Sequence, residues 1–250
     1  MINKKSENRI KIVFLFLLIF TMYGFSDKKV NTAAISTDRL EQKWWKERHE
    51  KILEKLDSNP QLILIGNSIL HTLDYPDRKI VWEKYLDKYN TLNIGFSGDR
   101  TENVIWRLQH GELEKINPKI ALLLIGTNNT DGNHFPTINN SYELEEAIWK
   151  ICEIIREKLP NTEILLLGIL PYGNNIPNFR NTINQKTNKL ISKFPSKNTH
   201  IHYIDIGKLY YYPNSTKVNK NLMPDYLHPN KEGHMLMFER LENEIEKLMK

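Results

Sequence analysis

Cysteine is nearly absent from this chain. Only Cys152 occurs among the 250 residues, so no intramolecular disulfide can form. Cys152 lies in an apolar pattern with Ile148, Ile151 and Ile155, and no histidine or asparagine motif accompanies it. We therefore expect a buried structural thiol rather than a nucleophile. A Gly-Lys-Ser or Gly-Lys-Thr sequence is also missing, which disfavours a P-loop nucleotide site.

A long apolar segment is missing too. The apolar run at residues 12–20 is too short to cross a bilayer comfortably. It follows a basic start and precedes Gly24 and Ser26, whose spacing suits a signal-peptide cleavage site. We expect residues 1–26 to be a signal peptide, so that the protein is exported (periplasmic or secreted) and not stably inserted in a membrane. An uncleaved N-terminal anchor is the alternative, and the lack of a following cysteine disfavours a lipoprotein.

Excess positive charge is small outside this segment. The whole chain has a net charge of +5, but residues 1–26 contribute four basic side chains against Glu7. The remainder carries 31 basic and 29 acidic residues, without a basic block. A nucleic-acid partner is therefore not expected.

From residue 60 onward, short apolar runs alternate with helical patterns. The runs do not alternate polar with apolar residues, which is typical of strands buried on both faces. Alternation of strands with helices predicts a parallel sheet covered on each side. We predict one three-layer α/β/α domain over residues 60–250, with a five-stranded parallel sheet in flavodoxin-like order. The expected strands are Leu62–Ile65, Leu92–Ile94, Ile120–Ile125, Ile164–Ile169 and Ile201–Ile204.

Residues 27–59 precede this domain. Residues 27–37 are polar and are expected to be a flexible tether, and residues 38–57 have the spacing of a helix. Trp44 and Trp45 within it are interpreted as core anchors rather than sugar platforms. Further helices are expected near residues 78–88, 101–109, 141–159, 179–194 and 230–249.

Two distant segments predict a nucleophilic site. Ser68 follows an apolar strand in a Gly-containing turn, and Asp225 and His228 stand three residues apart just before Pro229. A serine needs a base to take its proton, and the base needs a partner that holds its tautomer. Each motif has an ordinary alternative, namely an N-cap serine, a surface aspartate or a helix-capping histidine. Leu70 stands where a Gly-x-Ser-x-Gly elbow has glycine, so an ordinary α/β-hydrolase is disfavoured.

Two further residues follow predicted strands and could stabilise an oxyanion. Gly98 lets a backbone N–H approach a substrate oxygen, although a turn that needs positive φ would also select glycine. Asn128 offers a side-chain donor, although asparagine is also a favoured turn residue. Parallel sheets bind ligands at the carboxyl ends of their strands, so Ser68, Gly98 and Asn128 are expected on one rim.

These segments together resemble the SGNH (GDSL-type) hydrolases. Within that superfamily they are most similar to the catalytic subunits of intracellular platelet-activating-factor acetylhydrolase and their bacterial secreted relatives. The resemblance covers roughly residues 60–249 and is carried by Leu62–Ser68, Leu92–Thr101, Val104–Leu108, Gly111–Leu113, Gly126–Asn129 and Asp225–Pro229. Asn67 departs from the family, which usually has aspartate there, and Asn129 stands where many members have aspartate. Residue 67 normally supports the turn, so activity is expected to survive.

The resemblance implies a serine esterase without metal or organic cofactor. Ser68 would attack, His228 would act as base and Asp225 would orient it. The backbone N–H groups of Ser68 and Gly98 and the side chain of Asn128 would form the oxyanion hole. The resemblance implies a small-molecule or glycan ester as substrate, with a short acyl group, in particular acetyl. Export favours an O-acetylated glycan over an intracellular phospholipid.

Several alternatives stay open from the sequence. One is a lipid-directed esterase or lysophospholipase, and another is a non-catalytic glycan- or protein-binding domain on the same fold. His200 and His202 alternate on a strand and could hold a metal, but no third ligand is visible.

The bulky candidates for walls of the cleft are Tyr75, Phe96, His134, Phe135, Tyr172 and Tyr226. The sequence predicts no oligomeric state.

The interpretation of the N-terminal segment is directly testable. Cleavage near Ser26 is expected, so N-terminal sequencing of the mature exported protein should start close to Asp27. An intact Met1 in a membrane fraction would support the anchor instead. An intact Met1 in soluble cytosolic protein would contradict both interpretations.

Overall fold

The computed structural model describes residues 30–174 and 177–250. Five parallel strands form one sheet in the order β2-β1-β3-β4-β5, which confirms the predicted flavodoxin-like topology. The neighbouring strands are closely in register, with Ile63 beside Leu92 and Leu62 beside Ile120. The strands are β1 at Leu62–Gly66, β2 at Leu92–Gly95, β3 at Ile120–Leu124, β4 at Glu163–Leu167 and β5 at Ile201–Ile204.

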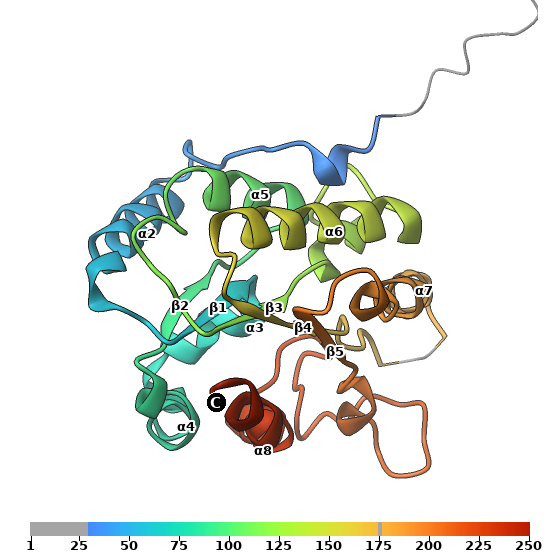
Figure 1. The fold of residues 1–250 in the computed structure, drawn as a ribbon. Helices are drawn as coiled ribbons and strands as arrows, with labels where there is room; N and C mark the ends of the chain where they lie inside the picture. The colour runs from blue at the N-terminus through green and yellow to red at the C-terminus, as the bar shows by residue number, and fades with distance from the viewer. Residues whose placement is uncertain (1–29, 175–176) are drawn as a thin grey trace, which may run out of the picture. The chain divides into compact units, whose positions relative to one another are not determined.

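Helices cover both faces of the sheet (Figure 1). One face carries α2 (Lys43–Glu54), α5 (Thr101–Gln109), α6 (Ser141–Lys158) and α7 (Phe179–Ile191). The other carries α3 (Ser68–His71), α4 (Lys79–Tyr85) and α8 (Lys231–Leu248). Short 3-10 helices lie at Thr32–Ala34, Leu56–Ser58, Thr72–Asp74, Pro76–Arg78, Asp87–Tyr89, Thr127–Thr130, Phe194–Ser196 and Gly207–Tyr210. No helix in the described ranges is both long and apolar enough to span a bilayer.

Strands β1, β2 and β3 are buried on both faces, as the lack of polar–apolar alternation predicts, and so is β4 apart from Glu163. The prediction was wrong for the edge strand β5, where only Ile201 is buried. Ile63 and Ile65 point into the core under α5 and α6, whereas Leu62 and Leu64 point into the core under α4 and α8. All four are fully buried. Each such side chain contributes roughly 1.5–3 kcal/mol by leaving water, so the two cores hold the layers together. Cys152 is also buried, and burial raises the pKa of its thiol to about 12, which suits the structural role predicted for it.

The N-terminal helix differs from its prediction. It begins at Lys43 rather than Asp38. Trp45 is fully buried and confirms its predicted role, but Trp44 is 40% exposed, so its assignment to the core was wrong. Successive residues of a helix point about 100° apart, and the rotation of α2 directs Trp45 into the core and Trp44 toward solvent.

The segment before α2 is packed rather than free. Ala33 is buried, and its carbonyl accepts a hydrogen bond from Thr101 Oγ1 at 2.8 Å. Asn31 Nδ2 donates to the carbonyl of Glu143 at 2.9 Å. Residues 31–37, expected as part of a flexible tether, therefore lie against α5 and α6, and the compact unit spans Asn31–Lys250. The predicted signal peptide lies outside the described residues.

A buried ionic network lies beneath the loop that follows β2. Asp99 is fully buried and accepts hydrogen bonds from Trp45 Nε1 at 2.8 Å, Arg107 Nε at 2.8 Å and Arg39 at 3.0 Å. Arg107 is also fully buried, and it binds Glu112 as well. Burial raises the pKa of Asp99, and the positive charges of Arg107 and Arg39 oppose that rise.

Removing one partner from such a network leaves an uncompensated buried charge. We expect Arg107→Met to lower the free energy of unfolding by about 3–5 kcal/mol, because Asp99 and Glu112 then lose their shared cation. Urea denaturation followed by circular dichroism measures this. The exposed Arg240 on α8 provides a matched control, and Arg240→Met should stay within about 0.5 kcal/mol of the wild type. Equal stability of the two variants would contradict the role given to the network.

Candidate active site

Ser68 and His228 meet across 160 residues of sequence. Ser68 Oγ lies 2.9 Å from His228 Nε2. Ser68 opens α3 directly after β1, and His228 lies in the loop before α8. The serine is buried, whereas about a third of the histidine side chain is exposed, so the pair lies at the floor of an accessible surface.

Asp225 holds the far side of the imidazole. His228 Nδ1 lies 2.6 Å from Asp225 Oδ2, and the other carboxylate oxygen accepts the backbone N–H groups of Leu227 and His228. Partial burial alone would raise the pKa of Asp225, but the hydrogen bonds from His228 outweigh it and keep that pKa below its usual value. A charged Asp225 favours a proton on Nδ1, which leaves Nε2 as an acceptor facing Ser68. Tyr226, at φ 60°, provides the tight turn that lets the carboxylate reach back to His228.

The turn before Ser68 depends on its two preceding residues. A Cβ on Gly66 would lie 2.3 Å from the carbonyl oxygen of Leu124, so only glycine lets β1 approach β3 this closely. Asn67 is the N-cap of α3, and its Oδ1 accepts the N–H of Ile69 at 3.0 Å. Asn67 thus supports the turn as an aspartate would. Ser68 is not the capping residue, so the ordinary alternative suggested for it from sequence does not hold.

Gly98 and Asn128 are brought together by the loop after β2. Gly98 has φ 77°, which confirms that the turn requires a left-handed residue. Asn128 Nδ2 donates a hydrogen bond at 2.8 Å to the backbone carbonyl of Asp99, the residue that follows Gly98. A carboxamide carries two N–H donors, so one remains to be directed at a ligand. The buried carboxylate of Asp99 anchors this loop from below, which couples the ionic network to the position of Asn128.

Two histidines fix α3 in place. His71 Nδ1 accepts the N–H of Ser97 at 3.1 Å and lies 2.9 Å from Ser97 Oγ, which ties α3 to the Gly98 loop. Burial, and then the charge of Arg48, lower the pKa of His71 to about 4, so the ring is neutral and can accept at Nδ1. His234 Nε2 donates to the carbonyl of Ile69 at 2.8 Å, and burial lowers the pKa of His234 to about 4 as well.

The other histidine pair lies apart from these residues, at β5. His200 and His202 bind the two oxygens of Glu163, at 2.8 and 2.6 Å. Glu163 begins β4 and was not recognised as their partner, because only the register between β4 and β5 brings it there. In the described ranges, no group of three or more His, Cys, Asp or Glu residues is placed to hold a metal ion.

One proposed wall of the cleft was wrong. Phe96 is fully buried, packs against Trp45 and lies under the guanidinium of Arg107, so it cannot contact substrate. Tyr75, by contrast, is exposed. The apolar pattern of the chain did not distinguish the two.

Comparison with known proteins agrees with this arrangement. The profile of the GDSL-like lipase/acylhydrolase family matches residues 64–236. Platelet-activating factor acetylhydrolase IB subunit alpha1 from Homo sapiens is 29% identical over 192 residues, which cover 77% of this chain and 78% of that protein.

Solved structures share the fold at lower identity. A putative platelet activating factor from Streptococcus pneumonia superposes with a TM-score of 0.62 at 20% identity, over 83% of this chain and 97% of that one. The acetyl xylan esterase AlAXEase gives a TM-score of 0.63 at 19% identity, over 74% and 98%. The profile covers more than half of the chain and includes Ser68 and His228. The chain therefore belongs to the GDSL-like lipase/acylhydrolase (SGNH) family, and it is a carboxylic ester hydrolase.

Proposed function

We propose that this protein is an exported serine esterase that removes short acyl groups, in particular acetyl, from a carbohydrate. The observation that carries the mechanism is the hydrogen-bonded chain from Ser68 Oγ through His228 to Asp225. No other group is needed to activate the serine, because the acceptor nitrogen of the imidazole already faces its hydroxyl.

In the first half-reaction, Ser68 Oγ attacks the ester carbonyl carbon while its proton passes to His228 Nε2. Asp225 stabilises the imidazolium through the 2.6 Å contact to Nδ1. The tetrahedral intermediate carries a negative oxygen. The backbone N–H groups of Ser68 and Gly98 and the second N–H of Asn128 are its proposed donors.

The intermediate then breaks its bond to the alcohol, which leaves with the proton from His228. An acyl-Ser68 ester remains. Water attacks this ester while His228 takes a proton from it. His228 then returns the proton to Ser68 Oγ as the acid leaves, which restores the free serine. Asn67 lies beneath Ser68 and takes no part in proton transfer, since its Oδ1 is bound to the N–H of Ile69.

Two observations support an acetyl group as the acyl part of the substrate and a sugar as its alcohol part. Acetyl appears in the names of both a sequence relative, the acetylhydrolase subunit, and a structural neighbour, the acetyl xylan esterase. The predicted signal peptide would place the enzyme among extracellular or periplasmic glycans. The acetylhydrolase relatives keep a lipid-directed esterase as the second candidate, which acyl-length selectivity distinguishes.

Replacement of the nucleophile or the base tests the mechanism. Ser68→Ala and His228→Ala should each lower kcat for p-nitrophenyl acetate by at least about 10³-fold, and the double variant should be little worse than either. Ser192→Ala and His110→Ala, at exposed positions elsewhere, serve as matched controls and should leave kcat unchanged. Near-normal turnover by Ser68→Ala would refute the assignment.

Acyl length tests the substrate class. Each methylene that finds no apolar wall forgoes about 0.8 kcal/mol of burial, and forced packing costs roughly 1–3 kcal/mol more. We expect kcat/KM for acetyl esters to exceed that for octanoyl esters by at least about tenfold. The measurement uses p-nitrophenyl esters of two to ten carbons, below their micelle limits. An optimum at eight carbons or more would instead indicate a lipid-directed enzyme.

A further inference from the structure

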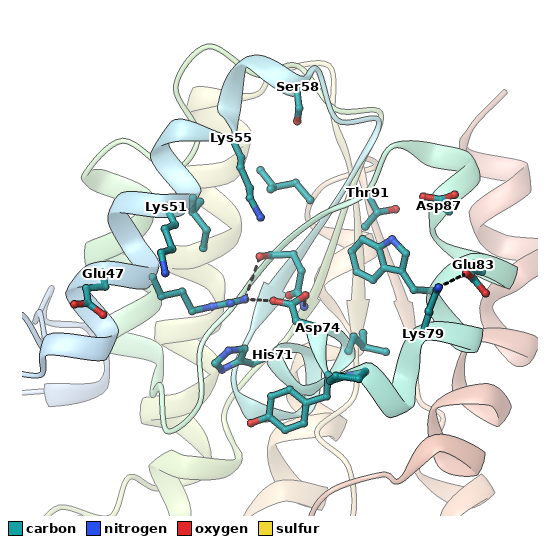
Figure 2. A pocket seen from close by; sticks show the side chains of 18 of the residues that line it. Glu47, Lys51, Lys55, Ser58, His71, Asp74, Lys79, Glu83, Asp87 and Thr91 are labelled. Carbon is teal, nitrogen blue, oxygen red and sulfur yellow. Dashed lines mark hydrogen bonds and ion pairs between the residues drawn. The ribbon is translucent and has the colours of Figure 1, made fainter.

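A large groove lies along the open edge of the sheet, and its lining includes His71 of α3, the helix that begins at Ser68. It runs between α2 and the segment from α4 to the following 3-10 helix, over the edge strand β2, and has a volume of about 990 Å³. Figure 2 shows Glu47, Lys51 and Lys55 along one wall and Lys79, Glu83 and Asp87 along the other. This volume is far more than an acetyl group needs, so the groove suits the remainder of a substrate.

The end of the groove nearest to Ser68 is aromatic. The rings of Trp44 and His71 are nearly parallel, 6.1 Å apart between centroids, and Tyr75 meets His71 edge-on at 6.1 Å. Trp44 is 40% exposed and Tyr75 is 47% exposed. Exposed aromatic rings that cluster beside polar groups in a groove are typical of a ligand-binding surface.

This aromatic end is joined to the catalytic loop by direct contacts. His71 lies one helical turn after Ser68, on the same side of α3, and binds Ser97 next to Gly98. Arg39 lies over the Trp44 ring at 5.5 Å and donates to the carbonyl of Ser97 at 2.9 Å. Through these contacts, the three rings of Trp44, His71 and Tyr75 are connected both to the helix of Ser68 and to the loop of Gly98.

The charges of the groove balance. Its lining includes four acidic and four basic side chains, and His71 is neutral because its pKa is lowered to about 4. Arg48 pairs with Asp74 at 2.8 Å and Lys79 with Glu83 at 3.5 Å. Such a surface attracts neither a polyanion nor a polycation. It does offer many hydrogen-bond donors and acceptors.

These features exclude the other common occupants. An extended peptide would need the free edge of β2, but Arg48 already binds the carbonyls of Gly95 at 2.9 Å and Asn93 at 3.3 Å. A fatty acyl chain would have to desolvate charged side chains on both walls. A nucleic acid would need an excess of basic residues.

A neutral sugar chain fits all of these constraints, because each sugar ring has an apolar face that stacks on aromatic rings and a polar rim that hydrogen-bonds. We propose that the groove binds the saccharide chain of an O-acetylated neutral oligosaccharide, with Trp44, His71 and Tyr75 as the subsite next to Ser68. This inference rests on the esterase function proposed above. It adds that the alcohol part of the substrate is polymeric and uncharged.

Kinetics with matched substrates test the proposal. O-acetylated xylohexaose, cellohexaose and mannohexaose are compared with their acetylated monosaccharides and with p-nitrophenyl acetate. At least one hexasaccharide should have a KM at least tenfold below that of its monosaccharide. Trp44→Ala and Tyr75→Ala should each raise that KM at least fivefold, and the loss of kcat/KM on the hexasaccharide should exceed the loss on p-nitrophenyl acetate at least fivefold. Tyr142→Ala, at a 71% exposed tyrosine on α6 that is not part of the groove lining, should change neither.

Two kinetic outcomes would overturn the proposal. One is an equal KM for hexasaccharide and monosaccharide in all three series. The other is an equal loss of activity on p-nitrophenyl acetate and on the hexasaccharide in both groove variants, which would make the rings purely structural.

Calorimetry separates this inference from the esterase assignment. The full chain with Ser68→Ala should bind the preferred hexasaccharide, and additional Trp44→Ala should weaken binding at least fivefold. This result would support the groove even if the wild-type protein hydrolysed no ester. Tighter binding of O-acetylated hexagalacturonate, or Trp44-dependent binding of phosphatidylcholine vesicles without binding of any neutral hexasaccharide, would refute the neutral-sugar assignment.

Discussion

The 2.9 Å contact between Ser68 Oγ and His228 Nε2 links a residue after the first strand to a loop near the C-terminus. Nothing local brings these two residues together. They meet because parallel strands place all their carboxyl ends on one rim, and because the loop before α8 returns to that rim. This contact is the one on which the other features of the site depend. They are the imidazole tautomer set by Asp225, the turn formed by Asn67 and the conformation of the Gly98 loop.

The rigidity of the rim comes from polar groups beneath it. Asp99 is buried among Arg107, Arg39 and Trp45, and its own carbonyl accepts the side chain of Asn128. Buried ion pairs contribute little net stability compared with a well-packed apolar core. These ion pairs hold the loop that carries Gly98 and Asp99 in one position, and that loop in turn holds the side chain of Asn128.

Much of the architecture could be predicted from the sequence. All five strands lie within about two residues of their predicted bounds, and Ile201–Ile204 matches without any change. The fold and the family follow from the order of the motifs at the strand ends. Ser68, His228 and Asp225 lie together as expected.

The features that the sequence did not show depend on the direction in which a side chain points and on the register between neighbouring strands. Trp44 and Trp45 are alike as residues, and only the rotation of α2 decides that one is buried and the other open. Glu163 lies 37 residues from His200, and the pairing of Ile164 with Ile201 is what joins them. Phe96 follows a strand in the same way as a wall residue would, but its ring turns into the core.

Trapping the nucleophile tests the central claim most directly. Diisopropyl fluorophosphate reacts with a serine whose hydroxyl is activated by a neighbouring base, and mass spectrometry of the digested protein locates the adduct. The account predicts one adduct, on the peptide that contains Ser68, and its loss in the His228→Ala variant. An active enzyme that forms no adduct, or one labelled at another residue, would contradict it.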